Sequence, residues 1–153
     1  MQVTLVILKP SAVQRGILGE VIGRFEKKGI QIVGMKMMCL SDEILAEHYA
    51  HLFNKPFYGR IKASMQAGPV VVMALKGVDV VNIVRKLTGV TNGREALPGT
   101  IRGDYSMSVQ ENIVHASDSP DTAAAELKRF FNPGEIVDDP PFLIPFLYAQ
   151  DEL

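Results

Sequence analysis

One histidine stands in a sequence context that suits chemistry on phosphate. The stretch 112–119 reads NIVHASDS and places His115 between an apolar run and a helix start. A lone histidine after two apolar residues is most often structural, but imidazole can also act as a nucleophile. Ser119 followed by Pro120 is typical of a helix N-terminus just beyond the ring. We therefore expect His115 to be held rigidly where a strand ends.

A carboxylate follows at a spacing that suits a partner for this ring. The pattern of apolar residues over 123–131 predicts a helix, and Glu126 lies about two turns along it. A carboxylate that accepts a proton from one imidazole nitrogen fixes the tautomer and leaves the other lone pair free to attack. The sequence thus predicts that Glu126 folds back towards His115.

Basic residues gather in a stretch rich in glycine and proline. The segments VRKLTGVTNGRE and LPGTIRGD contain turn residues and four cations: Arg85, Lys86, Arg94 and Arg102. Because the planar guanidinium matches phosphate oxygens, two or three arginines brought together by turns can neutralise a polyphosphate. The alternative is a set of solvated arginines, the commoner outcome for any single charged side chain.

Strands and helices must position these groups. The β-branched run 2–8 predicts a central strand, so Lys9 emerges at a strand end. Further strands are expected over 30–40 and 69–75. Helices are expected over 16–28, from the cap Ser41 through Tyr49, over 57–66 and over 78–87. Residues 88–103 are expected to form an irregular functional loop.

Composition bounds the class of protein. The 153 residues, 47% of them hydrophobic, suit one domain with a proper core. A net charge of −1 gives no general attraction to nucleic acid or to an anionic membrane. Neither a signal peptide nor a membrane-spanning stretch is evident. Cys39 is interpreted as a small core residue in a reducing compartment, and the chain as cytoplasmic.

The order of the motifs is more specific than any one of them. The chain resembles the nucleoside diphosphate kinase family along nearly its whole length, in the blocks LVILKPSAVQRGILGEVIGRFEKKG, EHY, KPFYG, GPVVVMAL, PGTIRGD and NIVHASDS. The resemblance implies a single domain over 1–153 with a divergent tail over 132–153. It also implies an α/β fold of the α+β sandwich type, with a ferredoxin-like βαββαβ core. In that core a four-stranded antiparallel sheet is covered by helices on one face, whereas alternating strands and helices alone could suggest a parallel sheet.

The resemblance also implies an activity and a set of roles. The chain would move the terminal phosphate of a nucleoside triphosphate such as ATP to a nucleoside diphosphate by a ping-pong mechanism. His115 would carry the phosphate on its pros nitrogen, oriented by Glu126 and supported by Ser117. The nucleotide would be bound by Lys9, Tyr49, Phe57, Arg85, Thr91, Arg102, Val109 and Asn112. Stacking on Phe57 beside Val109 would hold the base as a flat object, which implies broad specificity.

The expected cofactor is Mg²⁺, carried by the nucleotide phosphates rather than by protein side chains. A glycine-rich loop ending in Gly-Lys-Ser/Thr is absent, so side chains must supply most phosphate contacts. His48 and His51, three residues apart, could suggest a metal site, but a solvated helix face is favoured. The methionines, especially Met35, Met37 and Met38, are interpreted as adaptable core filling.

The expected partners are nucleotides and other copies of the chain. The resemblance implies a homo-oligomer, a hexamer rather than a tetramer, with no nucleic acid and no membrane. The apolar tail, which contains Pro140, Pro141, Phe142 and Pro145, is expected to pack against something, and folding back on its own subunit is the alternative. A non-catalytic nucleotide sensor and a phosphorelay protein are the rival functions. Departures from the family pattern are Ser11, Gly93 and Ala116.

Overall fold

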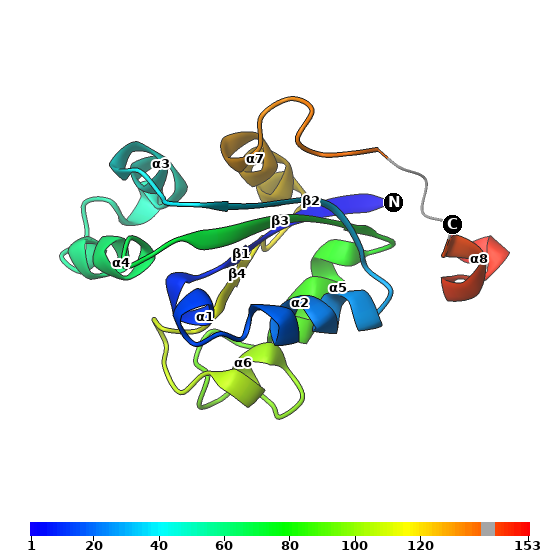
Figure 1. Ribbon diagram of the computed structural model, residues 1–153, viewed down its shortest axis with the longest axis horizontal. Coiled ribbons are helices and arrows are strands. Elements are labelled where there is room, and N and C mark those ends of the chain that lie inside the picture. The colour runs from blue at the N-terminus through cyan, green and yellow to red at the C-terminus, as the bar shows by residue number, and fades with distance from the viewer. Residues whose placement is uncertain (139–142) are drawn as a thin grey trace.

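A four-stranded antiparallel sheet forms the centre of the computed structural model, which describes residues 1–138 and 143–153 (Figure 1). Its strands are β1 (Gln2–Leu8), β2 (Gln31–Met38), β3 (Val70–Gly77) and β4 (Val114–Ala116). Their order is β2-β3-β1-β4, and every neighbouring pair is antiparallel. The predicted ferredoxin-like core is therefore confirmed, and a parallel sheet is excluded.

Helices cover both faces of this sheet, so the expectation of one covered face was wrong. Figure 1 shows α3 (Asp42–His48) and α7 (Pro120–Phe130) on one side, and α2 (Leu18–Lys27) and α5 (Val80–Thr88) on the other. Successive side chains of β1 enter different cores, with Leu5 and Ile7 on the α7 side and Val6 and Leu8 on the α2 side. A strand that is apolar at both parities needs a helical layer on each face.

Helix ends follow the predicted signals. The Ser41 hydroxyl accepts a hydrogen bond from the Ile44 N–H at 3.2 Å, and the Ser119 hydroxyl accepts one from the Thr122 N–H at 3.1 Å. Gly29, with a φ of 88°, follows the end of α2. The remaining elements are α1 (Pro10–Gln14), η1 (Ala50–Leu52), α4 (Tyr58–Met65), α6 (Ile101–Tyr105), α8 (Ile144–Leu147) and η2 (Gln150–Glu152). The sequence had not indicated α1 or α6, and α6 begins inside the expected loop.

The edge position of β2 corrects two expectations. Met35 and Met37 are 55% and 57% exposed, so they do not fill the core, whereas the half-buried Met38 packs against it. Cys39 follows the end of the strand and is also exposed rather than buried. Successive side chains of a strand point to opposite faces of the sheet, and at this edge the face that Met35 and Met37 share is left exposed.

The described part of the tail lies back on its own chain. The Val137 N–H donates to the Val33 carbonyl at 2.8 Å, and the Tyr148 hydroxyl accepts from the Val78 N–H at 3.3 Å. Leu147 lies against Gly29, where a Cβ would come within 2.5 Å of it. Pro140, Pro141 and Phe142 fall outside the described residues. Within the described residues, no helix is long and apolar enough to cross a membrane.

Candidate active site

Two adjoining cavities form one cleft. The larger, of about 790 Å³, is lined by the predicted residues Lys9, Tyr49, Arg85, Thr91, Arg102, Asn112, His115 and Glu126. The smaller, of about 370 Å³, is lined by Phe57 and Val109, and it shares Lys9, Tyr49, Thr91 and Asn112 with the larger. Ser117 lines neither cavity, because it is buried behind Glu126. We call the larger cavity the phosphate end and the smaller the base end.

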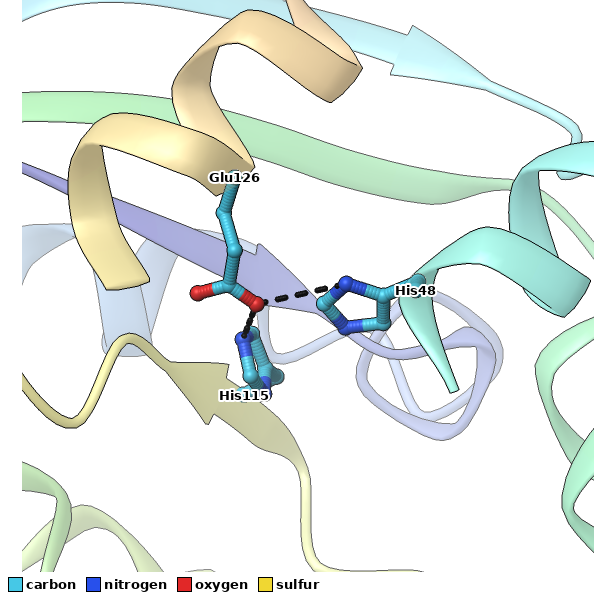
Figure 2. A group of neighbouring side chains, drawn as sticks. All are labelled: His48, His115 and Glu126. Carbon is cyan, nitrogen blue, oxygen red and sulfur yellow. Dashed lines mark hydrogen bonds and ion pairs between the residues drawn. The ribbon is translucent and has the colours of Figure 1, made fainter. Parts of the chain in front are cut away.

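The side chains of His115 and Glu126 meet, as Figure 2 shows, and both residues line the phosphate end. His115 is the middle residue of β4 and pairs with Ile7 of β1. Its Nε2 lies 2.7 Å from Oε2 of Glu126, which projects from α7. The other oxygen, Oε1, accepts a hydrogen bond from the Ser117 hydroxyl at 2.6 Å. Nε2 is therefore engaged by the carboxylate, and Nδ1 is left as the second ring nitrogen.

The surroundings keep Glu126 ionised. Its side chain is 5% exposed, and burial by itself would raise the pKa of the carboxyl group. The hydrogen bond and charge of His115, together with the Ser117 hydroxyl, outweigh burial and lower the pKa below its ordinary value. A carboxylate with both oxygens occupied is also fixed in orientation.

A strained turn immediately precedes the histidine strand. The Val114 N–H donates to the Asn112 carbonyl at 2.8 Å, and Ile113 between them has a φ of 72°. This is a classic γ-turn. Left-handed backbone at a β-branched residue costs about 1–3 kcal/mol, and the fully buried Ile113 side chain helps to hold it. Nothing in the sequence indicates this turn, because NIV is typical of a simple extended strand.

Lys9 is tied to this turn across the sheet. Its ammonium group donates to Oδ1 of Asn112 at 2.6 Å and approaches the Gln110 carbonyl at 3.4 Å. Asn112 in turn donates from Nδ2 to the Thr91 carbonyl at 3.0 Å. Burial, followed by the charge of Arg102, lowers the pKa of Lys9 to about 8, while Glu111 opposes the shift. A partly desolvated cation at this position favours the binding of an anion.

Arg102 is held in place by backbone carbonyls. Its guanidinium donates to Asn112 at 3.2 Å, to Gly89 at 2.9 Å and to Val114 at 2.6 Å. These bonds use three of its five N–H groups and leave two for a ligand. Burial, and then the charge of Arg85, lowers its pKa to about 10, so it stays cationic near neutral pH.

The other predicted cations divide into two groups. Arg85 is exposed and lines the phosphate end. Lys86 and Arg94 do not line either part of the cleft, and Arg94 donates instead to the Met107 carbonyl at 3.3 Å. The structure therefore supports the alternative for Lys86 and Arg94, which are solvated surface cations.

The base end is apolar and open. Phe57, which precedes α4, is 37% exposed, and Val109 is 52% exposed. At its rim the Ser64 hydroxyl donates to Oε1 of Glu111 at 2.5 Å. Between the two ends stands Tyr49, whose pKa is raised to about 12 by burial, so its hydroxyl remains a donor. This surface suits the face of an aromatic ring.

His48 is the residue that sequence reasoning missed. It was expected on a solvated helix face with His51, but it is buried, and only His51 is exposed. Its ring lies 4.7 Å from that of His115 between centroids, and its Nδ1 lies 3.2 Å from Oε2 of Glu126 (Figure 2). The helix ends at His48, so the expected shared face does not extend to His51. The buried Leu45, three residues earlier, was the available signal.

These three groups do not make a convincing metal centre. One donor atom from each of His48, His115 and Glu126 lies within 4.8 Å of the others. Two imidazoles and one carboxylate suit zinc rather than Mg²⁺. However, Nη1 of Arg129 lies 3.0 Å from Nδ1 of His48, and a fixed guanidinium there opposes a second cation.

Comparisons with known proteins agree with this site and fold. The family model described as nucleoside diphosphate kinase matches residues 2–136. A nucleoside diphosphate kinase of Parabacteroides distasonis is 63% identical over 152 residues, covering 99% of each chain. One of Rhodopirellula baltica is 49% identical over 152 residues, covering 99% of this chain and 100% of that protein.

Solved structures give the same result. A halophilic nucleoside diphosphate kinase from Halobacterium salinarum, in complex with CDP, superposes with a TM-score of 0.94 at 38% identity, covering 97% of this chain and 99% of that one. The enzyme of Encephalitozoon cuniculi gives a TM-score of 0.92 at 36% identity, covering 97% of this chain and 100% of that one. Because model, relatives and structures match the chain almost end to end, it belongs to the nucleoside diphosphate kinase family and is a phosphotransferase.

Proposed function

We propose that the chain transfers the terminal phosphoryl group of a nucleoside triphosphate to a nucleoside diphosphate through a phosphohistidine at His115. The observation that carries this proposal is the 2.7 Å contact between Nε2 of His115 and the buried Glu126. A proton held on Nε2 by the carboxylate leaves the Nδ1 lone pair free for attack. The cations Lys9 and Arg102 line the same cavity.

The reaction proceeds in two phosphoryl-transfer steps. Nδ1 of His115 attacks the terminal phosphorus, and a P–N bond forms as the P–O bond to the departing diphosphate breaks. The diphosphate leaves with the electron pair of that bond. A second diphosphate then occupies the cleft, one of its terminal oxygens attacks the phosphohistidine, and the P–N bond breaks. The carboxylate of Glu126 stabilises the positive charge that the ring acquires while it carries the phosphoryl group.

Pre-positioned donors stabilise charge on the transferring group. Lys9 and Arg102 are held by long-range hydrogen bonds, so they need little reorganisation when the phosphate arrives. Arg85, Thr91, Asn112 and the hydroxyl of Tyr49 complete the proposed set of phosphate and sugar contacts. Because the transition state has little covalent character, positioning and electrostatics account for most of the catalysis.

Base recognition follows from the apolar base end. Phe57 and Val109 offer surface for stacking and van der Waals contact. Stacking tolerates every base, because each has a π-face. The chain should therefore accept both purine and pyrimidine nucleotides.

Nucleotide kinases generally need a divalent cation, and we propose Mg²⁺ for this chain. Both oxygens of Glu126 are already engaged, and nitrogen donors dominate around it, so the site offers no oxygen cage of its own. That donor set fits a Mg²⁺ that arrives on the nucleotide, held by phosphate oxygens and water. When bound, the ion neutralises phosphate charge, and the side chains bind and orient the rest.

We further propose a cytoplasmic homo-oligomer, with a hexamer favoured over a tetramer. The family implies this assembly, and the exposed Met35 and Met37 on the edge strand supply apolar surface for contacts between copies. Light scattering coupled to size-exclusion chromatography measures the state directly. A monomer at micromolar concentration would contradict the proposal.

The phosphohistidine is the testable core of the proposed function. The protein is incubated with ATP labelled on its terminal phosphate, without acceptor, and acid-labile label on the protein is measured before and after addition of a nucleoside diphosphate. The wild type should take up label and lose it to the acceptor. His115→Gln should take up none, whereas the matched control His51→Gln, at an exposed histidine of the same cavity, should behave as wild type.

Three outcomes would contradict it. If His115→Gln becomes labelled as well as the wild type, the proposed nucleophile is wrong. If label appears on His115 but only another protein discharges it, the chain is a phosphorelay protein instead. A chain that binds nucleotide and never becomes labelled is a sensor.

A further inference from the structure

Nδ1 of His48 lies at a junction between two oppositely charged groups. Nη1 of Arg129 approaches it at 3.0 Å with hydrogen-bond geometry. Oε2 of Glu126 lies 3.2 Å from the same nitrogen, at ion-pair distance, and is also the atom that contacts His115. Nδ1 of His48 therefore lies between the Arg129 donor and the Glu126 carboxylate that also contacts His115.

The chemistry of arginine decides where the proton of His48 sits. A guanidinium can only donate hydrogen bonds, so Nδ1 of His48 must accept in the contact with Arg129. A neutral imidazole carries one proton, which then lies on Nε2. Nε2 is buried without a hydrogen-bond partner among the described residues, so this placement has a cost that the Arg129 contact must offset.

Arg129 also has an ion-pair contact with α3, although its Nε makes no hydrogen bond within the described residues. Its Nε lies 3.2 Å from Oε1 of Glu47, the residue that precedes His48 on α3. The Arg129 side chain is 16% exposed, and that of His48 is 2% exposed. The contact thus joins α7 to α3 in a largely dry environment, where hydrogen bonds are strong.

We propose that Arg129 and His48 are positioning residues for phosphoryl transfer: the hydrogen bond from Arg129 keeps Nδ1 of His48 free of a proton and so reserves Oε2 of Glu126 for His115. This inference rests on the proposed role of His115. A proton on Nδ1 would let His48 compete for Oε2, and His115 would lose the partner that fixes its tautomer.

The groups around His48 act in the same direction. Burial is the largest cause that lowers the pKa of His48, to about 3, and the charges of His115, Arg129 and His51 add to it. Glu126 alone opposes them. Glu47 faces Arg129 rather than the ring, and the neighbouring Tyr49 contacts the ring edge at 4.7 Å between centroids. His48 therefore stays neutral at pH values near 7.

The first test reads the proton directly and needs no activity. In wild-type protein labelled with ¹⁵N, long-range proton–nitrogen NMR spectra assign the tautomer of each histidine ring between pH 6 and pH 9. We expect His48 to carry its proton on Nε2 throughout. A proton on Nδ1 overturns the inference, while the phosphohistidine of the proposed function would be unaffected.

The second test removes the hydrogen bond. Arg129→Met should let the neutral His48 ring carry its proton on Nδ1 and donate it to Oε2 of Glu126, so kcat should fall about tenfold at every pH from 6 to 9. The nucleotide KM should stay the same, since the variant leaves the phosphate and base contacts in place. Lys128→Met, an adjacent exposed residue of equal charge, is the matched control and should keep the wild-type kcat.

A second substitution separates positioning from loss of structure. In Arg129→Met combined with His48→Phe, the new ring cannot compete for Glu126, so kcat should return towards that of the wild type. Thermal unfolding is followed for each variant. An unchanged kcat in Arg129→Met overturns the inference, as does a folded double variant no more active than Arg129→Met. If the double variant does not fold, the NMR spectra of the wild type and of Arg129→Met are compared instead. The proton of His48 should move from Nε2 to Nδ1 in Arg129→Met, and a proton that stays on Nε2 overturns the inference.

Discussion

The two ends of the cleft are built in different ways. At the phosphate end, Lys9, Arg102 and Glu126 are half-buried or buried, and each is fixed by hydrogen bonds to other elements or loops of the chain. At the base end, Phe57 and Val109 are exposed apolar side chains. The first arrangement suits selective stabilisation of a transition state, whereas the second suits general binding. Substitutions at the phosphate end should therefore lower kcat, and those at the base end should raise KM.

The largest effect is expected at Glu126. In Glu126→Gln the new amide can donate to Nε2 of His115, which would place the ring proton on Nδ1 and remove the attacking lone pair. By analogy with other histidines held in the wrong tautomer, kcat should fall about 10³- to 10⁴-fold with little change in KM. Steady-state kinetics measures this. A large rise in KM with unchanged kcat would break the distinction between the two ends.

Lys9→Met is expected to be the next most severe change. Loss of a pre-positioned cation at the transferring phosphate should lower kcat by about 10²- to 10³-fold. Stability should not fall, because the folded state currently bears the cost of a desolvated ammonium group. Kinetics and thermal unfolding together test this, and a less stable variant would show that Lys9 is mainly structural.

The pKa of Lys9 predicts opposite pH dependences for activity and stability. Above its pKa of about 8 the ammonium loses its charge, so kcat/KM should fall about tenfold per pH unit at first. The unfolded chain, with an ordinary lysine pKa of 10.5, binds more protons than the folded chain between pH 8 and 10.5, so stability should rise across that window. Lys9→Met should abolish both trends, and a trend that persists in this variant belongs to another group.

The smallest expected effect lies at the base end. Phe57→Ala removes a stacking surface worth about 1–3 kcal/mol per base, and partial exposure places this case at the low end, so KM should rise about fivefold. We expect kcat to change less than twofold, because uniform binding is lost. Measured with one purine and one pyrimidine diphosphate, the rise should be similar. A selective loss for one base would show that Phe57 reads more than a flat ring.

The sequence alone indicated part of this arrangement. The contact of His115 with Glu126 follows from a local pattern, because a strand, a helix cap and a helix follow one another directly between two residues only 11 positions apart. Arg85 and Arg102 were candidate phosphate ligands from their own sequence context, and the remaining ligands were implied by the family resemblance. His48, Arg129 and the γ-turn at Ile113 were not foreseen, because their roles depend on contacts between elements far apart in sequence. The exposure of Met35 and Met37 depends on which strand lies at the edge, and no single strand reveals that.

The hydrogen bond from Lys9 to Asn112 joins residues 103 positions apart. Closing so long a loop costs conformational entropy, which the chain must lose before this contact can contribute to stability. Partly folded chains, including those still on the ribosome, would thus lack the assembled phosphate end and leave nucleoside triphosphates intact. During refolding from denaturant, the return of phosphotransfer activity should coincide with the final kinetic phase rather than with the formation of helices.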